Sequence, residues 1–113
     1  MRVLAWSAPM MLAVTSVASA HVHLKQSTPA EGAVVSTAPA QIVLTFSEPA
    51  LVTSLSIQHD ANQPEKLGPV PKDAEVTVTV PTPGLKPGKY IVTWRAVSDD
   101  NHITSGQVHF TIS

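Results

Sequence analysis

The amino-acid sequence predicts an all-β domain built as a two-sheet antiparallel sandwich. Three observations lead to this prediction. After residue 20, short runs alternate apolar and polar residues with a period of two, which is typical of half-buried strands. The segments between these runs carry Pro, Gly and Asp, residues that favour chain reversal. No segment after residue 20 shows a helical period of useful length.

Five alternating runs define the main predicted strands, which are residues 41–47, 54–58, 75–80, 90–97 and 107–112. Their expected inward faces are Ile42, Leu44 and Phe46; Leu55 and Ile57; Val76, Val78 and Val80; Tyr90, Val92, Trp94 and Ala96; and Val108, Phe110 and Ile112. We expect Trp94 to fill the core between the sheets. Residues 24–27 are expected to form an edge strand, with a further strand around Val34. This makes six or seven strands, a count that favours an immunoglobulin-like sandwich.

Turn residues separate the predicted strands. Pro- and Gly-containing connections lie at residues 28–32, 81–84 and 86–88. Pro39 and Pro49 flank the strand at residues 41–47, which is consistent with a strand bounded at both ends. No linker or internal repeat interrupts this pattern, so we expect one domain.

The first twenty residues have the pattern of a secretory signal peptide. Arg2 is the only charged residue before Lys25, residues 3–17 are mainly apolar, and Ala-Ser-Ala at residues 18–20 suits a signal peptidase. A transmembrane anchor or a buried first helix is the alternative, but the apolar run is shorter than the ~20 residues that a span needs, and Pro9 interrupts it. The prediction is a signal peptide at residues 1–20 and an exported domain at residues 21–113, with no membrane insertion after cleavage.

The composition of residues 21–113 narrows the possible functions. The chain has no cysteine, and its three methionines, Met1, Met10 and Met11, all lie in the leader. The domain therefore has no disulfide and no sulfur ligand for a metal. Seven Lys and Arg, of which Arg2 is in the leader, stand against eight Asp and Glu. Without a basic patch, nucleic acid is not expected as a partner.

The histidines suggest a metal site. There are five: His21, His23, His59, His102 and His109. Cleavage after Ala20 would make His21 the N-terminal residue, where an ordinary α-amino group has a pKa of about 7.7–8.0. Once neutral, that amine and the imidazole of the same residue can chelate one ion. Neutral nitrogen donors suit Cu(II), which prefers a tetragonal set of N and O ligands.

A second pair of candidate ligands lies in residues 98–102, expected to be a loop between two strands. Asp100 and His102 are two residues apart, so both can point the same way where the chain is extended. One carboxylate, one imidazole and the chelating His21 make a plausible three-residue site. The plainer interpretation is that Asp99 and Asp100 are turn residues.

Four motifs in order carry a family resemblance: a His start after the signal peptide, Ser-Thr-Pro-Ala-Glu-Gly at residues 27–32, Phe-Ser-Glu at residues 46–48, and Trp-Arg-Ala-Val-Ser at residues 94–98 leading into Asp100-x-His102. The chain resembles the CopC family of periplasmic copper-binding proteins along essentially its full mature length. The resemblance implies a Greek-key β-barrel or sandwich in the periplasm.

The resemblance also implies one Cu(II) per chain, bound by the amine and imidazole of His21, the carboxylate of Asp100 and the imidazole of His102. Glu48 matches a glutamate near the site in some members, as a weak axial or outer ligand, although it is equally a surface charge before a proline. Some members carry a Met-rich loop for Cu(I); the matching residues, 59–71, contain no methionine, so we expect a Cu(II)-only variant. Zinc or nickel could bind the same donors, and the availability of each metal in the cell would then decide which ion is bound.

The other histidines have weaker claims. An N-terminal His-Val-His can bind Cu(II) by itself through the amine, two deprotonated amides and the ring of His23, but this needs a flexible terminus. We treat His23 as a nearby alternate ligand. His59 and His109 are expected to be solvated surface residues without a role.

The expected function is a monomeric copper carrier or buffer in copper resistance or homeostasis, not an enzyme, and the resemblance implies transfer to a CopD-type inner-membrane transporter. Two other functions stay open. One is a small copper oxygenase, because an N-terminal His with an internal His also builds the active site of lytic polysaccharide monooxygenases. The other is an immunoglobulin-like structural domain whose metal binding is incidental.

Overall fold

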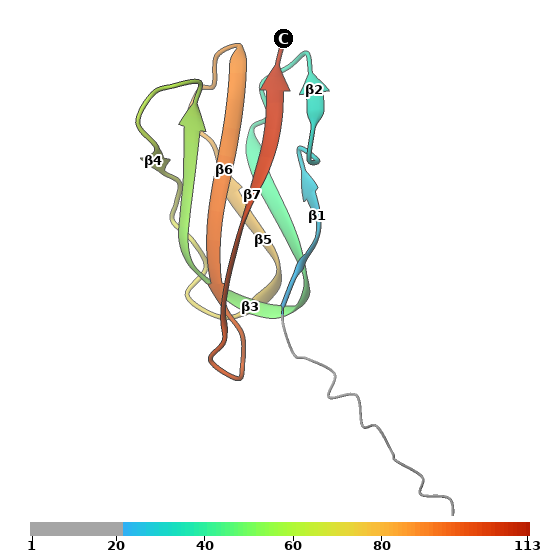
Figure 1. Cartoon of the computed structure of the whole chain (residues 1–113), viewed down its shortest axis with the longest axis vertical. Coiled ribbons are helices and arrows are strands. Elements are labelled where there is room, and N and C mark those ends of the chain that lie inside the picture. The colour runs from blue at the N-terminus through green and yellow to red at the C-terminus, as the bar shows by residue number, and fades with distance from the viewer. Residues whose placement is uncertain (1–21) are drawn as a thin grey trace, which may run out of the picture.

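The computed structural model describes residues 22–113, which form seven strands and no helix (Figure 1). The strands are β1 (Leu24–Thr28), β2 (Ala33–Val35), β3 (Gln41–His59), β4 (Glu65–Lys66), β5 (Glu75–Pro81), β6 (Gly88–Val97) and β7 (Ile103–Ile112). Over this range no helix exists that could cross a membrane. The predicted signal peptide and His21 lie outside the described residues.

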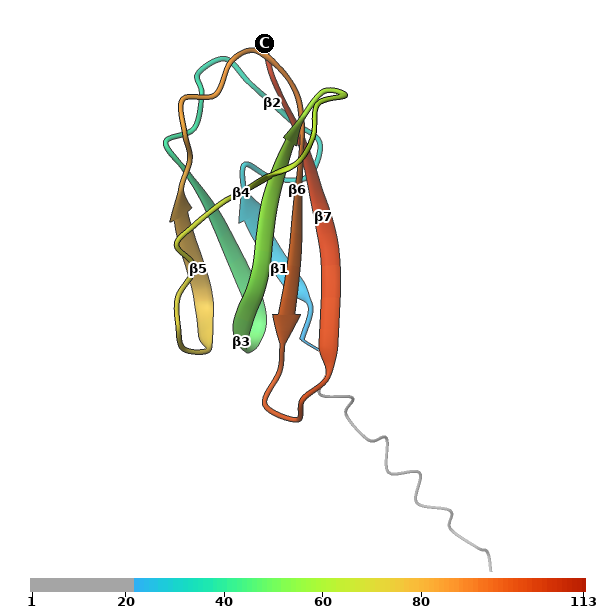
Figure 2. The ribbon, with the colours of Figure 1, turned by 90° about the vertical axis from the view of Figure 1, so that its left-hand side faces the viewer.

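The long strand β3 belongs to both layers of the sandwich. Its first half pairs with β1 and β5, and its second half pairs with β6 and β4. β6 then pairs with β7, and β7 with β2. Figure 2 shows β3 turning at one end of the molecule and returning in the other layer. The predicted all-β sandwich or barrel is confirmed.

Three details differ from the sequence prediction. The runs at residues 41–47 and 54–58 are one strand, and Pro49 lies inside it rather than beyond its end. Register shifts between residues 45 and 50 and between residues 52 and 54 interrupt the ladders there, and a proline, which has no N–H to donate, is tolerated at such a break. β2 runs parallel to β7, so the pairing is not wholly antiparallel. The two-residue β4 is too short to leave an alternating pattern.

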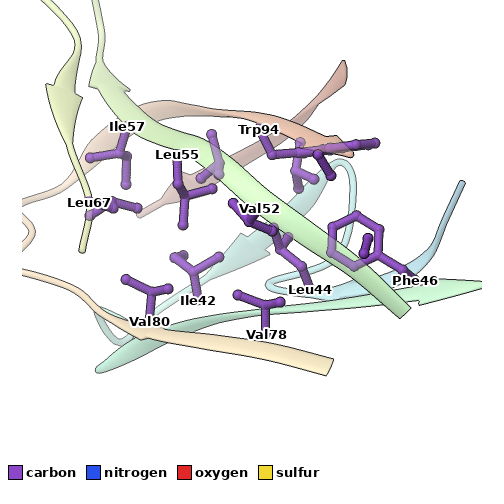
Figure 3. Packing of buried hydrophobic residues seen from close by; sticks show 14 of the residues in the cluster. Ile42, Leu44, Phe46, Val52, Leu55, Ile57, Leu67, Val78, Val80 and Trp94 are labelled. Carbon is purple, nitrogen blue, oxygen red and sulfur yellow. The ribbon is translucent and has the colours of Figure 1, made fainter. Parts of the chain in front are cut away.

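The core lies between the layers and contains nearly all of the predicted inward faces, together with Val22, Ala50, Val52 and Leu67, which were not predicted (Figure 3). Trp94 is only 4% exposed and meets Phe46 edge to face, with ring centroids 5.1 Å apart. The exception is Val76, which is 42% exposed. It falls within the register shift between β3 and β5, where the alternation no longer turns its side chain inward.

Candidate metal centre

Three segments meet at one end of the sandwich, which we call the site pole: residues 22–23, the β3 bend at residues 47–49, and the β6–β7 loop at residues 98–102 (Figures 1 and 2). The first two are joined by hydrogen bonds. The backbone N–H of His23 donates to Ser47 Oγ at 3.0 Å, and the N–H of Ser47 donates to the His23 carbonyl at 2.8 Å. The bend and the loop are linked by a pocket of about 110 Å³ lined by Glu48, Pro49, Ser98, Asp99 and Asp100.

The loop at residues 98–102 is closed by its own backbone. The N–H of Ser98 donates to the carbonyl of His102 at 3.0 Å, and the N–H of Asn101 donates to the carbonyl of Ser98 at 2.9 Å. Asn101 has a φ of 65°, a left-handed conformation that asparagine tolerates better than most residues. This tight turn projects the side chains on either side of Asn101 from one end of the hairpin.

The turn brings the two predicted ligands into contact. Nδ1 of His102 lies 2.7 Å from Oδ2 of Asp100. The other oxygen, Oδ1, accepts a hydrogen bond from the hydroxyl of Ser98. Chiefly this hydroxyl, and secondarily hydrogen bonds from His102, lower the pKa of Asp100 to about 2, against the opposing effect of burial. The carboxylate is therefore ionised at neutral pH.

The contact also settles the roles of the ring atoms. An ionised carboxylate can only accept, so in the metal-free protein Nδ1 of His102 donates to Oδ2 of Asp100. An ion bound by both of these atoms would take the place of the proton between them. Side-chain exposures of 58% for His102 and 39% for Asp100 leave both within reach of an ion from solvent. A carboxylate oxygen and an imidazole nitrogen held together are donors of the kind that Cu(II) accepts.

The remaining predicted ligands are placed less directly. Glu48 is exposed and shares the small pocket with Asp100. His23 lies at the site pole, but its backbone N–H is engaged with Ser47, and the preceding Val22 is only 1% exposed. Copper binding through deprotonated amides would have to break this bond, because it uses the same nitrogen.

Two histidines have partners away from the site pole. His59 stacks on Tyr90 with ring centroids 4.6 Å apart, and its Nε2 lies 3.0 Å from the carbonyl of Pro87. His109 is exposed as expected, with Nδ1 3.2 Å from the Glu31 carboxylate. Among residues 22–113, no three His, Cys, Asp or Glu side chains are grouped closely enough to hold a metal.

Ser98 is a site residue to which sequence reasoning assigned no role. A usable signal was present: the inward series Tyr90, Val92, Trp94 and Ala96 reaches Ser98 at its next step. Ser98 is 7% exposed and is the polar residue buried within the described part of the chain. A serine at an inward position beside an Asp-x-His segment indicates a hydroxyl with a local acceptor.

A family model for the CopC domain matches residues 24–113. The chain belongs to the CopC family. It is 37% identical to copper resistance protein C of Pseudomonas syringae pv. tomato over 110 residues, covering 88% of this chain and 86% of that protein. It is 38% identical to protein YobA of Escherichia coli K12 over 106 residues, covering 88% and 83%.

Solved CopC-family structures share the fold. CopC from Methylosinus trichosporium OB3b superposes with a TM-score of 0.70 at 27% identity, covering 82% of this chain and 94% of that one. PcoC from Escherichia coli, described as a methionine-rich copper resistance protein, gives a TM-score of 0.64 at 32% identity, covering 83% and 100%. The present chain differs from that description, because its methionines all lie within residues 1–11.

Proposed function

We propose that this CopC-family protein binds one Cu(II) ion in the periplasm and acts as a copper carrier or buffer in copper resistance. The observation that carries the proposal is the Asp100–His102 pair, held at the end of the sandwich where the described chain begins. Two curated relatives named copper resistance protein C support copper as the ion.

The proposed ligands are the amine and imidazole of His21, a carboxylate oxygen of Asp100 and the imidazole of His102. Signal peptidase cleavage after Ala20 would create the amine. Within residues 22–113, Asp100 and His102 offer two of these donors side by side, which is fewer than a tetragonal Cu(II) site uses. His21, which would supply the others, immediately precedes this range in the sequence. Glu48 is proposed as an outer ligand because it lines the pocket beside Asp100.

Cu(II) is proposed rather than Cu(I) because of the donor chemistry. Cu(I) prefers thiolate and thioether ligands, and residues 21–113 contain neither cysteine nor methionine. His23 is left as an alternate ligand because its amide is bonded to Ser47. Zinc and nickel remain competitors for the same nitrogen and oxygen donors.

A binding role is proposed in preference to oxygenase chemistry. The aromatic side chains Phe46, Tyr90, Trp94 and Phe110 are all buried, so none of them presents a ring on which a sugar could stack. The protein is proposed to act as a monomer and to pass copper to a CopD-type inner-membrane transporter, as the family resemblance implies.

The test is a Cu(II) titration of processed protein beginning at His21, beside a version with one extra N-terminal methionine. The expected result is one tightly bound Cu(II) for the processed protein, and loss of that binding mode when the methionine masks the amine. Asp100→Ala and His102→Ala are expected to weaken binding and change the visible and EPR spectra. Equal affinity and equal spectra for the processed and extended proteins would refute the chelate.

A further inference from the structure

The hydroxyl of Ser98 is buried at the base of the loop that carries Asp100 and His102. Ser98 is 7% exposed, at the next inward position after Ala96. Burying a hydroxyl costs free energy unless it is hydrogen-bonded, so this side chain needs a partner. Its proton is directed to Oδ1 of Asp100, while a second acceptor, the carbonyl of His102, lies farther away at 3.3 Å.

The fold of the loop does not depend on this hydroxyl. The loop is closed by the backbone N–H of Ser98 and the backbone N–H of Asn101, groups that any non-proline residue supplies at those positions. The stronger contact of the hydroxyl is with a side chain, the Asp100 carboxylate, rather than with the loop backbone. Its structural effect therefore falls on the orientation of that carboxylate.

A carboxylate with a different partner on each oxygen cannot rotate without breaking a bond. Oδ1 of Asp100 is held by Ser98, and Oδ2 lies 2.7 Å from Nδ1 of His102. The three side chains form a chain of hydrogen bonds from the buried end of β6 to the exposed imidazole. Residues that orient metal ligands in this way typically influence affinity although they do not touch the ion.

We propose that Ser98 is a positioning residue of the copper centre: its hydroxyl holds Oδ1 of Asp100 and thereby turns Oδ2 toward the ring of His102. The copper part of this inference rests on the proposed function, whereas the orientation of the ring is a property of the metal-free protein. Without the hydroxyl, Asp100 gains rotational freedom and the His102 ring loses a fixed partner. The expected cost is about tenfold in Cu(II) affinity, at the lower end of the effect of such outer groups.

The experiment compares processed wild-type protein with Ser98→Ala, Ser98→Thr and Ser105→Ala. Ser105 is an exposed β7 residue whose side chain has no hydrogen-bond partner among the described residues, so it is the matched control. Cu(II) affinity is measured by competition, the copper hyperfine splitting by EPR, and the ring nitrogens of metal-free His102 by ¹⁵N NMR. Thermal unfolding of each variant reports on the fold.

The inference predicts weaker binding, an altered hyperfine splitting and shifted His102 ring signals in Ser98→Ala, with wild-type values in Ser105→Ala and recovery in Ser98→Thr. Wild-type ring signals and spectrum in Ser98→Ala would overturn it, as would a loss of affinity that only follows a lower melting temperature. If Ser98→Ala does not fold, Ser98→Cys, with a weaker donor of similar size, replaces it. If wild-type protein binds Cu(II) no better than a histidine peptide, the proposed function fails, and the metal-free NMR comparison still decides the role of Ser98.

Discussion

Small polar residues determine the geometry of the turn that carries Asp100 and His102. Asn101 takes the left-handed conformation, and Ser98 provides both the backbone closure and the carboxylate contact. The i, i+2 spacing predicted that Asp100 and His102 could point the same way in an extended chain, but they meet instead across a tight turn in which Asn101 is left-handed. The contact with Ser98 could not be predicted from spacing, because it depends on which rotamer the buried hydroxyl adopts.

The ionisation of Asp100 gives the proposed site a specific pH dependence. With a pKa of about 2, this carboxylate stays charged between pH 7 and pH 5, so protons compete with copper only at the nitrogen ligands over that range. Affinity is expected to fall toward pH 5 in wild-type protein. Asp100→Ala should bind more weakly, whereas His102→Ala, which lacks one of the titrating nitrogen ligands, should show a shallower slope. Competition titrations at several pH values measure this, and a flat wild-type response would count against nitrogen ligation.

Glu31 links the turn after β1 to β7, away from the proposed copper site. Its Oε1 accepts from the backbone N–H of His109 at 2.9 Å, and the ring of His109 lies 3.2 Å away. The hydrogen bond from the backbone N–H, followed by that from the ring, lowers the pKa of Glu31. A carboxylate whose pKa is lower in the folded state than in the unfolded state stabilises the fold when the pH is above its unfolded-state pKa. This contribution is lost as the pH falls through the folded-state pKa.

We therefore expect Glu31→Gln to reduce the free energy of unfolding at pH 7 and the difference from wild type to shrink below about pH 4.5. Urea unfolding at pH 7, 5 and 3 measures this. Glu75→Gln is the control, because Glu75 is exposed on β5 without a hydrogen-bond or ion-pair partner in the described part of the chain. A difference that stays constant with pH would contradict the prediction.

At the scale of the elements, the alternation of apolar residues predicted the strands and their inward faces where the ladders are regular. The alternation gave wrong predictions where the ladders are irregular. The two strands predicted at residues 41–47 and 54–58 form the single bent strand β3. This was not predicted because a period-two pattern cannot distinguish a bend from a loop around Pro49. Val76 is exposed for a related reason, since the register shift that moves it is set by the pairing partner. The parallel β2–β7 pair is a tertiary contact without a local signal.

The pairing of β6 with β7 depends on a glycine opposite Trp94. Gly106 lies across from Trp94, and a Cβ at residue 106 would lie 2.7 Å from Cζ2 of the indole. Trp94 is buried against Phe46 and has little room to move. We expect Gly106→Ala to destabilise the fold by about 1–3 kcal/mol, the usual cost of overpacking.

Urea or thermal unfolding checks this prediction against Gly84→Ala. A Cβ at Gly84 would have no neighbour within 4 Å, so that variant is expected to be neutral or slightly more stable. Equal stability of the two variants would contradict the prediction, because it would show that the Trp94 indole can move aside without lowering the free energy of unfolding.

At the scale of the whole molecule, the topology explains how residues from opposite ends of the sequence share one pole. β1 carries the chain away from the site pole, β3 runs to that pole, bends at residues 47–49 and leaves it again, and the β6–β7 hairpin returns to it beside residues 22–23 (Figures 1 and 2). Sequence spacing alone could not establish this meeting, because it follows from strand order. The family resemblance implied it, and the arrangement of residues 22–113 agrees with it.

Copper at this position would connect the two ends of the domain, so its binding is expected to stabilise the fold. An ion that binds only the folded state adds about 2.7 kcal/mol at a free concentration of one hundred times its Kd. Unfolding of processed protein with and without Cu(II) measures the gain, and His102→Ala should show a much smaller one. An equal gain in that variant would place the ion elsewhere.

The burial of Val22 has a consequence for maturation. Because this side chain is packed in the core at 1% exposure, the strand cannot slip along its neighbour to compensate for a misplaced cut. Cleavage one residue away from the bond before His21 would move the free amine by up to about 3.8 Å, the length of one residue step. If the predicted cleavage and the proposed ligand set are right, the position of the cut, and not a later adjustment of the folded strand, decides whether the free amine lies within reach of Asp100 and His102.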